Sequence, residues 1–169
     1  MKGMEWCTKT GLGSYAVQVG DIRVGAVVCV NALGNIYDRG GNCIAGMRRE
    51  DGSGFESVSE LMIANHSRVT ENKFTGNTTI GVILTNGRFS KYRMTKIASM
   101  AHSGYARAIS PIFTSADGDT IYAMSTGNVP ADEDLVGTLA AEVMQEAIYR
   151  AVDSAESGYG FPAAKDIRR

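Results

Sequence analysis

Two long stretches of the chain repeat apolar side chains at intervals of three and four residues, the spacing of one helix face. The first covers 90–109 and ends at Ser110-Pro111. The second covers 132–152 and begins with three acidic residues, which suit the positive end of a helix dipole. A shorter pattern over 58–67 predicts another helix. Because each long helix is apolar on one side only, both must pack against another layer.

Continuous runs of small and β-branched side chains predict the strands. Residues 24–31 and 78–85 consist almost entirely of apolar, small or β-branched residues, so we expect these two strands to be buried on both faces. Shorter strands are expected over 112–114 and 120–124. The alternation of strands with one-sided helices predicts a layered α/β or α+β fold.

Polar and glycine-rich segments separate these elements. Residues 34–54 are rich in Gly, Asn, Arg and Asp and predict a long loop, and Asn86-Gly87 predicts a turn. No linker or internal repeat divides the 169 residues. We therefore expect residues 1–169 to form a single domain.

Composition narrows the class of protein. Hydrophobic residues make up 44% of the chain and the net charge is −1, as in an ordinary globular protein. Lys and Arg are scattered, which disfavours nucleic-acid binding, and the longest apolar run is too short to span a membrane. Cys7, Cys29 and Cys43 are odd in number and form no CxxC pair, which favours free thiols in the cytoplasm.

Candidate chemistry lies where the strand 78–85 begins. If the chain were cut between Asn77 and Thr78, the new α-amino group would lie beside the hydroxyl of the same residue. Such an amine, with an ordinary pKa of ~8, can take the proton of the hydroxyl and activate it as a nucleophile. The alternative is a polar loop that simply leads into a buried strand.

Four further polar residues are candidates for the same site. Asn31 ends a strand, and its amide could stabilise a developing negative oxygen or hydrogen-bond its own turn. Asp117 and Asp119 point the same way if their segment is extended, and could hold the amine of Thr78 or bind calcium. Lys2 could place a cation near the reacting carbonyl or be a solvated terminal side chain.

Six segments, in order along the chain, then point to a known family. They are 2–4 with 11–14, 24–34, 77–82, 100–109, 117–127 and 160–166. Together they resemble the DmpA-type aminopeptidases, the P1 or S58 family of peptidases. This family includes β-peptidyl aminopeptidases and nylon-oligomer hydrolases.

The resemblance implies a four-layer αββα sandwich and self-cleavage between Asn77 and Thr78 into two subunits that stay together. It implies hydrolysis of short peptides or small amides through an acyl-enzyme, without a metal or organic cofactor. The catalytic residues that it carries over are Thr78, Asn31, Asp117, Asp119 and Lys2.

Members of that family have a sizeable stretch before the segment that begins here at Lys2. We therefore expect residues 1–169 to be the C-terminal half of a longer family domain, incomplete at its N-terminus. Exposed sheet edges would then favour a homo-oligomer. The alternative function is a catalytically inactive, truncated paralogue or fragment that acts as an assembly or small-ligand-binding protein. A third hypothesis is a calcium-binding domain that uses Asp117 and Asp119.

Overall fold

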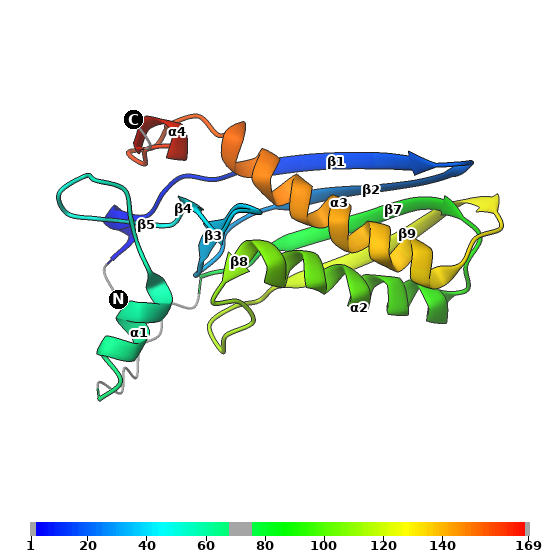
Figure 1. The fold of residues 1–169 in the computed structure, drawn as a ribbon, viewed down its shortest axis with the longest axis horizontal. Coiled ribbons are helices and arrows are strands. Elements are labelled where there is room, and N and C mark those ends of the chain that lie inside the picture. Colours follow the sequence, from blue (N-terminus) through cyan, green and yellow to red (C-terminus); the bar gives the residue numbers. More distant parts are fainter. Residues whose placement is uncertain (1–2, 68–75, 168–169) are drawn as a thin grey trace.

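The computed structural model describes residues 3–67 and 76–167, and its longer elements include the two long helices and two of the strands expected from the sequence (Figure 1). The strands are β1 Leu12–Val19, β2 Ile22–Cys29, β3 Asn35–Tyr37, β4 Cys43–Ala45, β5 Met47–Arg48, β6 Phe55–Glu56, β7 Ile80–Gly87, β8 Ile109–Ser110 and β9 Thr120–Val129. The helices are α1 Val58–Ala64, α2 Lys91–Ala108, α3 Glu133–Asp153 and α4 Ala164–Ile167, with a 3-10 turn at Met4–Trp6.

One four-stranded sheet, in the order β1-β2-β7-β9, carries the fold. The first three strands pair antiparallel, whereas β7 and β9 pair parallel because α2 returns the chain to the edge where β7 began. The first residues of β7 and β9 therefore lie side by side, at the left ends of these strands in Figure 1. A small sheet, β4-β3-β8, lies at that same end.

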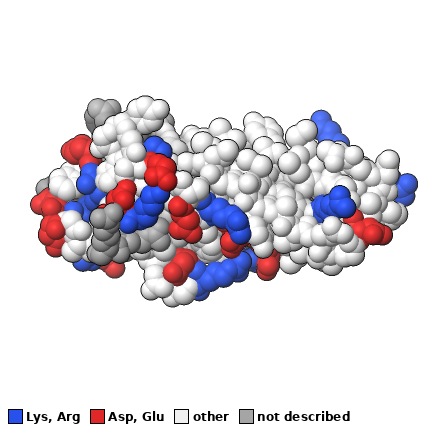
Figure 2. Space-filling view, turned by 90° about the horizontal axis from the view of Figure 1, so that it is seen from above, with Lys and Arg blue, Asp and Glu red and all other residues white. Residues whose placement is uncertain are grey.

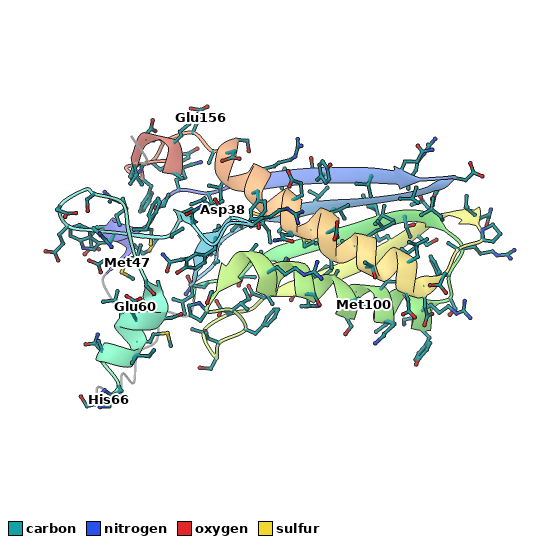
Figure 3. The ribbon with its side chains drawn as sticks, viewed as in Figure 1. Asp38, Met47, Glu60, His66, Met100 and Glu156 are labelled. Atoms are coloured by element: carbon teal, nitrogen blue, oxygen red, sulfur yellow. The ribbon has the colours of Figure 1, made fainter. Side chains whose placement is uncertain are left out.

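Helices α2 and α3 lie side by side over one face of the sheet and enclose the core (Figure 1). Gly104 lets the two helices approach closely, because a Cβ at that position would lie 2.4 Å from the carbonyl oxygen of Ala141. Met100, labelled on α2 in Figure 3, packs against Gly137 of α3 in the same way. The largest fully buried side chains between helices and sheet are Tyr105, Ile83, Ile97, Met144, Ile148, Val24 and Val28.

Both long helices begin at capping side chains. The Ser90 hydroxyl accepts a hydrogen bond from the N–H of Arg93, and the Asp132 carboxylate accepts from Asp134 and Leu135. These caps satisfy backbone donors that a helix leaves unpaired in its first turn. The predicted helices 90–109 and 132–152 are therefore confirmed, as is the shorter one near residue 58.

The opposite face of the sheet is apolar and exposed. Leu12 on β1 is 65% exposed, Ile80 on β7 47% and Tyr122 on β9 60%. Seen from above, the molecule shows a broad area without charged side chains beside its charged left end (Figure 2). The expectation that the strands 24–31 and 78–85 are buried on both faces is therefore wrong for this chain, whose helices cover only one face.

Three local predictions fail for identifiable reasons. Segment 34–54 is not one loop, because β3 pairs with β4 within it and β5 pairs with β6 directly after it. Asn86-Gly87 lies inside β7, where the Asn86 side chain bonds the backbone of Asp21 and Arg23 across the sheet instead of forming a turn. Residues 112–114 form no strand.

The sequence pattern did not indicate β1, an edge strand in which Tyr15 and Val17 form a short apolar alternation. The mixed α/β class itself is confirmed, with one helix layer and one main sheet among the described residues. No helix within residues 3–67 and 76–167 is long and apolar enough to cross a membrane.

Candidate active site

Thr78 lies just before β7, at the edge where β7 and β9 begin. Its backbone N–H donates a hydrogen bond to the carbonyl oxygen of Asn31 at 2.9 Å. Asn31 follows β2, the sheet neighbour of β7, so sheet order brings these two residues together. Thr78 is half-buried and Asn31 is exposed, which leaves this corner of the molecule open to solvent.

The peptide bond between Asn77 and Thr78 is held at its carbonyl oxygen. The Thr78 hydroxyl donates to the Asn77 oxygen at 2.6 Å, and the Gly118 N–H donates to the same oxygen at 3.0 Å. The hydroxyl is therefore in contact with the carbonyl group that it would attack in self-cleavage. Asn77 itself is buried and forms a parallel bridge with Asp117.

The side chain of Asn31 is also part of this arrangement. Its Nδ2 donates to the carbonyl oxygen of Gly76 at 2.7 Å, one residue before the predicted cleavage site. In the uncut chain the amide of Asn31 is thus occupied by the segment that cleavage would release. Its backbone carbonyl meanwhile holds the nitrogen that would become the free amine of Thr78.

Two carboxylates complete the cluster. Asp119 Oδ1 accepts from the N–H of Thr79 at 2.7 Å, and Asp117 Oδ2 accepts from the N–H and hydroxyl of Thr114 at 2.9 and 2.7 Å. The other oxygen of each, Asp117 Oδ1 and Asp119 Oδ2, is buried and has no hydrogen-bond partner among the described residues. Buried acceptors without partners are uncommon, so these two oxygens distinguish the cluster from the rest of the interior.

Burial raises the pKa of Asp119 above its ordinary value, and the nearby charge of Asp117 adds to this effect. The hydrogen bond from the N–H of Thr79 lowers the pKa and offsets part of the rise. A carboxyl with a raised pKa keeps its proton at higher pH, a property that suits a group which exchanges protons with a reacting atom.

Tyr105 on α2 is a member of the site that sequence reasoning assigned only to the core. Its side chain is fully buried, and its hydroxyl lies 3.3 Å from the carbonyl oxygens of both Thr79 and Thr120. It therefore bridges the residue before β7 and the first residue of β9. A tyrosine in an otherwise aliphatic stripe was the available signal, because a buried hydroxyl needs a partner.

Four of the five predicted catalytic residues thus lie in one cluster, which Asn31, Thr78, Asp117 and Asp119 form together with Asn77. Lys2 lies outside the residues that the structure describes. Within the described ranges, no three His, Cys, Asp or Glu side chains are grouped so that they could hold a metal ion. Among residues 3–67 and 76–167, Asp117 and Asp119 therefore lack the third side chain that a calcium site would need.

Comparison with known proteins gives a consistent result. The sequence pattern of Peptidase family S58 matches residues 2–165. The chain is 33% identical to the 6-aminohexanoate-oligomer endohydrolase of Paenarthrobacter ureafaciens, over 84% of this chain and 44% of that protein. It is 31% identical to an uncharacterized aminopeptidase of Mycobacterium leprae, over 91% of this chain and 47% of that one. The chain spans about half the length of the curated relatives that it matches.

Solved structures share the fold. The L-aminopeptidase D-Ala-esterase/amidase of Ochrobactrum anthropi, a variant of the Ntn-hydrolase fold, matches with a TM-score of 0.59 and 19% identity, over 94% of this chain and 46% of that one. A protein of Pyrococcus horikoshii matches with a TM-score of 0.56 and 20% identity, over 97% and 45%. Because the family pattern covers almost the whole sequence, this chain belongs to Peptidase family S58.

Proposed function

We propose that this chain is a self-cleaving N-terminal-nucleophile amidohydrolase in which Thr78 is the nucleophile. The observation that carries the proposal is the contact of the Thr78 hydroxyl with the carbonyl oxygen of Asn77, at 2.6 Å. A hydroxyl in contact with the preceding carbonyl, beside a backbone donor and two carboxylates, favours intramolecular attack over a purely structural role.

Self-cleavage proceeds by a shift of the acyl group from nitrogen to oxygen. Thr78 Oγ1 bonds to the carbonyl carbon of Asn77, and the bond between that carbon and the Thr78 nitrogen breaks as the nitrogen takes up the hydroxyl proton. Water then hydrolyses the ester, which frees the carboxyl group of Asn77 and restores the hydroxyl. The products are residues 1–77 and 78–169, which remain associated through the β2–β7 pairing.

Cleavage changes the partners of the site. The new amine of Thr78 is the general base for its own hydroxyl, with an ordinary pKa of ~8. As an ammonium it has three donors, and the unpartnered oxygens of Asp117 and Asp119 are the acceptors that hold it. The Asn31 amide loses Gly76 when that segment withdraws, and then donates to the oxyanion of a substrate.

The proposed substrates are short peptides or small amides. Support comes from the relatives, one of which is named for 6-aminohexanoate oligomers and another as an aminopeptidase. The substrate amide is attacked by Thr78 Oγ1, an acyl-enzyme forms as the amine leaves, and water releases the acid. These steps need only the chain's own residues and water.

The surroundings of the sheet support two further parts of the proposal. The exposed apolar face that includes Leu12, Ile80 and Tyr122 favours a chain that is the C-terminal half of a larger domain or assembles with copies of itself. Within the described residues no disulfide joins Cys7, Cys29 or Cys43, and two of the three are exposed, which favours a reducing compartment such as the cytoplasm.

The experiment is an amide-hydrolysis assay of the full-length protein with aminoacyl p-nitroanilides and a 6-aminohexanoate dimer. We expect turnover by the parent protein and by Thr126→Ala, a control that removes a threonine hydroxyl at the other end of β9. Thr78→Ala should be inactive. A folded parent protein that hydrolyses none of these amides, or a Thr78→Ala variant that still does, contradicts the proposal.

A further inference from the structure

We propose that the backbone N–H of Gly118 is the oxyanion donor for cleavage of the Asn77–Thr78 peptide bond, and that position 118 must be glycine for the Thr78 hydroxyl to attack. The inference deepens the proposed function and rests on it, because it concerns the self-cleavage step. It assigns a role in the reaction to a residue that lies between the two carboxylates and carries no side chain.

The position of this N–H is fixed by the register of the sheet. The parallel pairing of β7 with β9 places Ile80 opposite Thr120, and the Thr120 N–H donates to the Thr79 oxygen at 3.0 Å. Two residues earlier the same ladder continues as the Asn77–Asp117 bridge, in which the Gly118 N–H reaches the Asn77 oxygen at 3.0 Å. The donor is therefore held by the fold before the reaction begins, as electrostatic stabilisation of a transition state requires.

The other donors near this carbonyl cannot take its place. The Asn31 amide donates to the Gly76 oxygen, one peptide unit away. The Thr78 hydroxyl also donates to the Asn77 oxygen, but it gives up its proton as it becomes the nucleophile. Of the two donors that the described residues place on the Asn77 oxygen, the Gly118 N–H is the one that stays when the negative charge forms.

Glycine at position 118 leaves space for the nucleophile. A Cβ there would lie 2.8 Å from Thr78 Oγ1 and 3.6 Å from Thr78 Cγ2. The first distance is shorter than a normal contact, so any side chain at this position would push the hydroxyl away from the Asn77 carbonyl. Gly118 thus supplies a backbone N–H that donates to the Asn77 oxygen and, because it has no side chain, leaves space for the attacking oxygen.

During self-cleavage the negative charge forms on the Asn77 carbonyl oxygen. As Thr78 Oγ1 bonds to the Asn77 carbon, the carbonyl π electrons move onto the oxygen, and the Gly118 N–H stabilises that charge. When the carbonyl reforms, the bond from carbon to the Thr78 nitrogen breaks and the nitrogen leaves with the proton of the hydroxyl. Water later hydrolyses the ester.

The test replaces Gly118 by glycolic acid in cell-free synthesis of the full-length protein, so that an ester oxygen stands where the N–H was. Intact mass measured over time gives the cleavage rate. We expect cleavage to slow by about 100-fold, the usual cost of removing one oxyanion donor. The control is the same replacement at Gly158, whose N–H also donates to a backbone carbonyl at 3.0 Å, and it should cleave at the parent rate.

Clearance is tested separately with Gly118→Ala, which keeps the N–H but adds the methyl group. We expect it to cleave at least 10-fold more slowly than the parent protein at an unchanged melting temperature. The loss should be smaller in a Thr78→Ser background, because the serine hydroxyl has an additional rotamer free of the methyl group of threonine.

The outcomes separate this inference from the proposed function. If the parent protein is cut, Thr78→Ala is not, and the Gly118 ester is cut at the parent rate, the role of Gly118 is wrong and the proposed function stands. If Gly118→Ala is cut at the parent rate, the requirement for glycine is wrong. If the folded parent protein stays whole, both proposals fail.

Discussion

Buried polar groups differ in their hydrogen bonding between two regions of the molecule. One region is the core beneath α2 and α3, and the other is the cluster where β7 and β9 begin. In the core, the Gln145 amide donates to the Tyr149 hydroxyl at 2.7 Å. In the cluster, Asp117 Oδ1 and Asp119 Oδ2 are buried without a partner. An unsatisfied buried acceptor costs stability, so its retention points to a partner that appears only at another stage.

The comparison assigns stability to one region and chemistry to the other. Changes in the core should lower the free energy of unfolding and leave the cleavage rate intact. Changes in the cluster should lower the cleavage rate without lowering the free energy of unfolding. The following variants test this separation, beginning with the largest expected effect.

Thr78→Ala should abolish cleavage completely, because it removes the hydroxyl that contacts the Asn77 carbonyl. Thr78→Ser retains the hydroxyl and should still be cut. Intact mass distinguishes the two results, and circular dichroism should show the same fold for both. Cleavage of Thr78→Ala at the same bond would show that a group other than the Thr78 hydroxyl is the nucleophile.

Asp119→Asn should slow amide hydrolysis by about 100-fold or more, the usual contribution of a group that handles a proton. The reason is loss of an acceptor for the Thr78 amine, so the pH profile should change as well as the maximal rate. Asp153→Asn, on the last turn of α3, is the matched control and should behave like the parent protein. An unchanged rate and pH profile would show that Asp119 is structural.

Ile148→Ala should lower the free energy of unfolding by about 3 kcal/mol, because it leaves a cavity in the fully buried core. Ile148→Val should cost about 1 kcal/mol. Urea unfolding gives both values. At temperatures where the variants are folded, their cleavage rates should equal that of the parent, and a large loss of rate would break the separation of the two regions.

Stability should depend on pH through Asp119 in the uncut protein, for which Thr78→Ala is the background. Because the folded-state pKa of Asp119 is raised, the folded chain binds more protons than the unfolded chain just above the ordinary pKa of ~3.9. This contribution to stability is therefore present at low pH and is lost as pH rises through the folded-state pKa.

Asp119→Asn in that background should remove this loss. Its stability relative to the background should be greater at pH 7 than at pH 3.5, as measured by urea unfolding at the two pH values. A relative stability that decreases toward pH 7 would mean that the charged carboxylate is the favoured form.

Asp132→Ala removes the cap of α3 and should give the smallest effect, about 1 kcal/mol. Both backbone donors that it satisfies, on Asp134 and Leu135, would then depend on water. Thermal unfolding should report the change, while the cleavage rate stays the same because the cap lies away from the cluster. A loss smaller than about 0.3 kcal/mol would show that solvent replaces the cap.

The two regions also differ in how far sequence predicts them. The periodicity of α2 and α3 is a local property, so their apolar stripes and caps could be read directly. No local pattern indicates that β2, β7 and β9 meet at one edge. The site residues could therefore be identified only through ordered motifs, which contain Asn31, Thr78, Asp117 and Asp119. The bridging role of Tyr105 and the contact of Gly118 depend on parallel register, which no single segment contains.

The sheet faces illustrate the same limit. A run such as 24–31 predicts a strand with two apolar faces, but it does not say what covers each face. In this chain one face is covered by helices, and the other exposes Leu12, Ile80 and Tyr122. The β1 strand escaped prediction because it is an edge strand with little apolar alternation.

The most direct test of the account is N-terminal sequencing of the purified, full-length protein after incubation at neutral pH. Self-cleavage by Thr78 predicts a new terminus that reads Thr-Thr-Ile-Gly-Val, from a fragment that co-purifies with the residues before it. A folded protein that shows no such terminus, or one that begins at a different residue, would contradict the central claim.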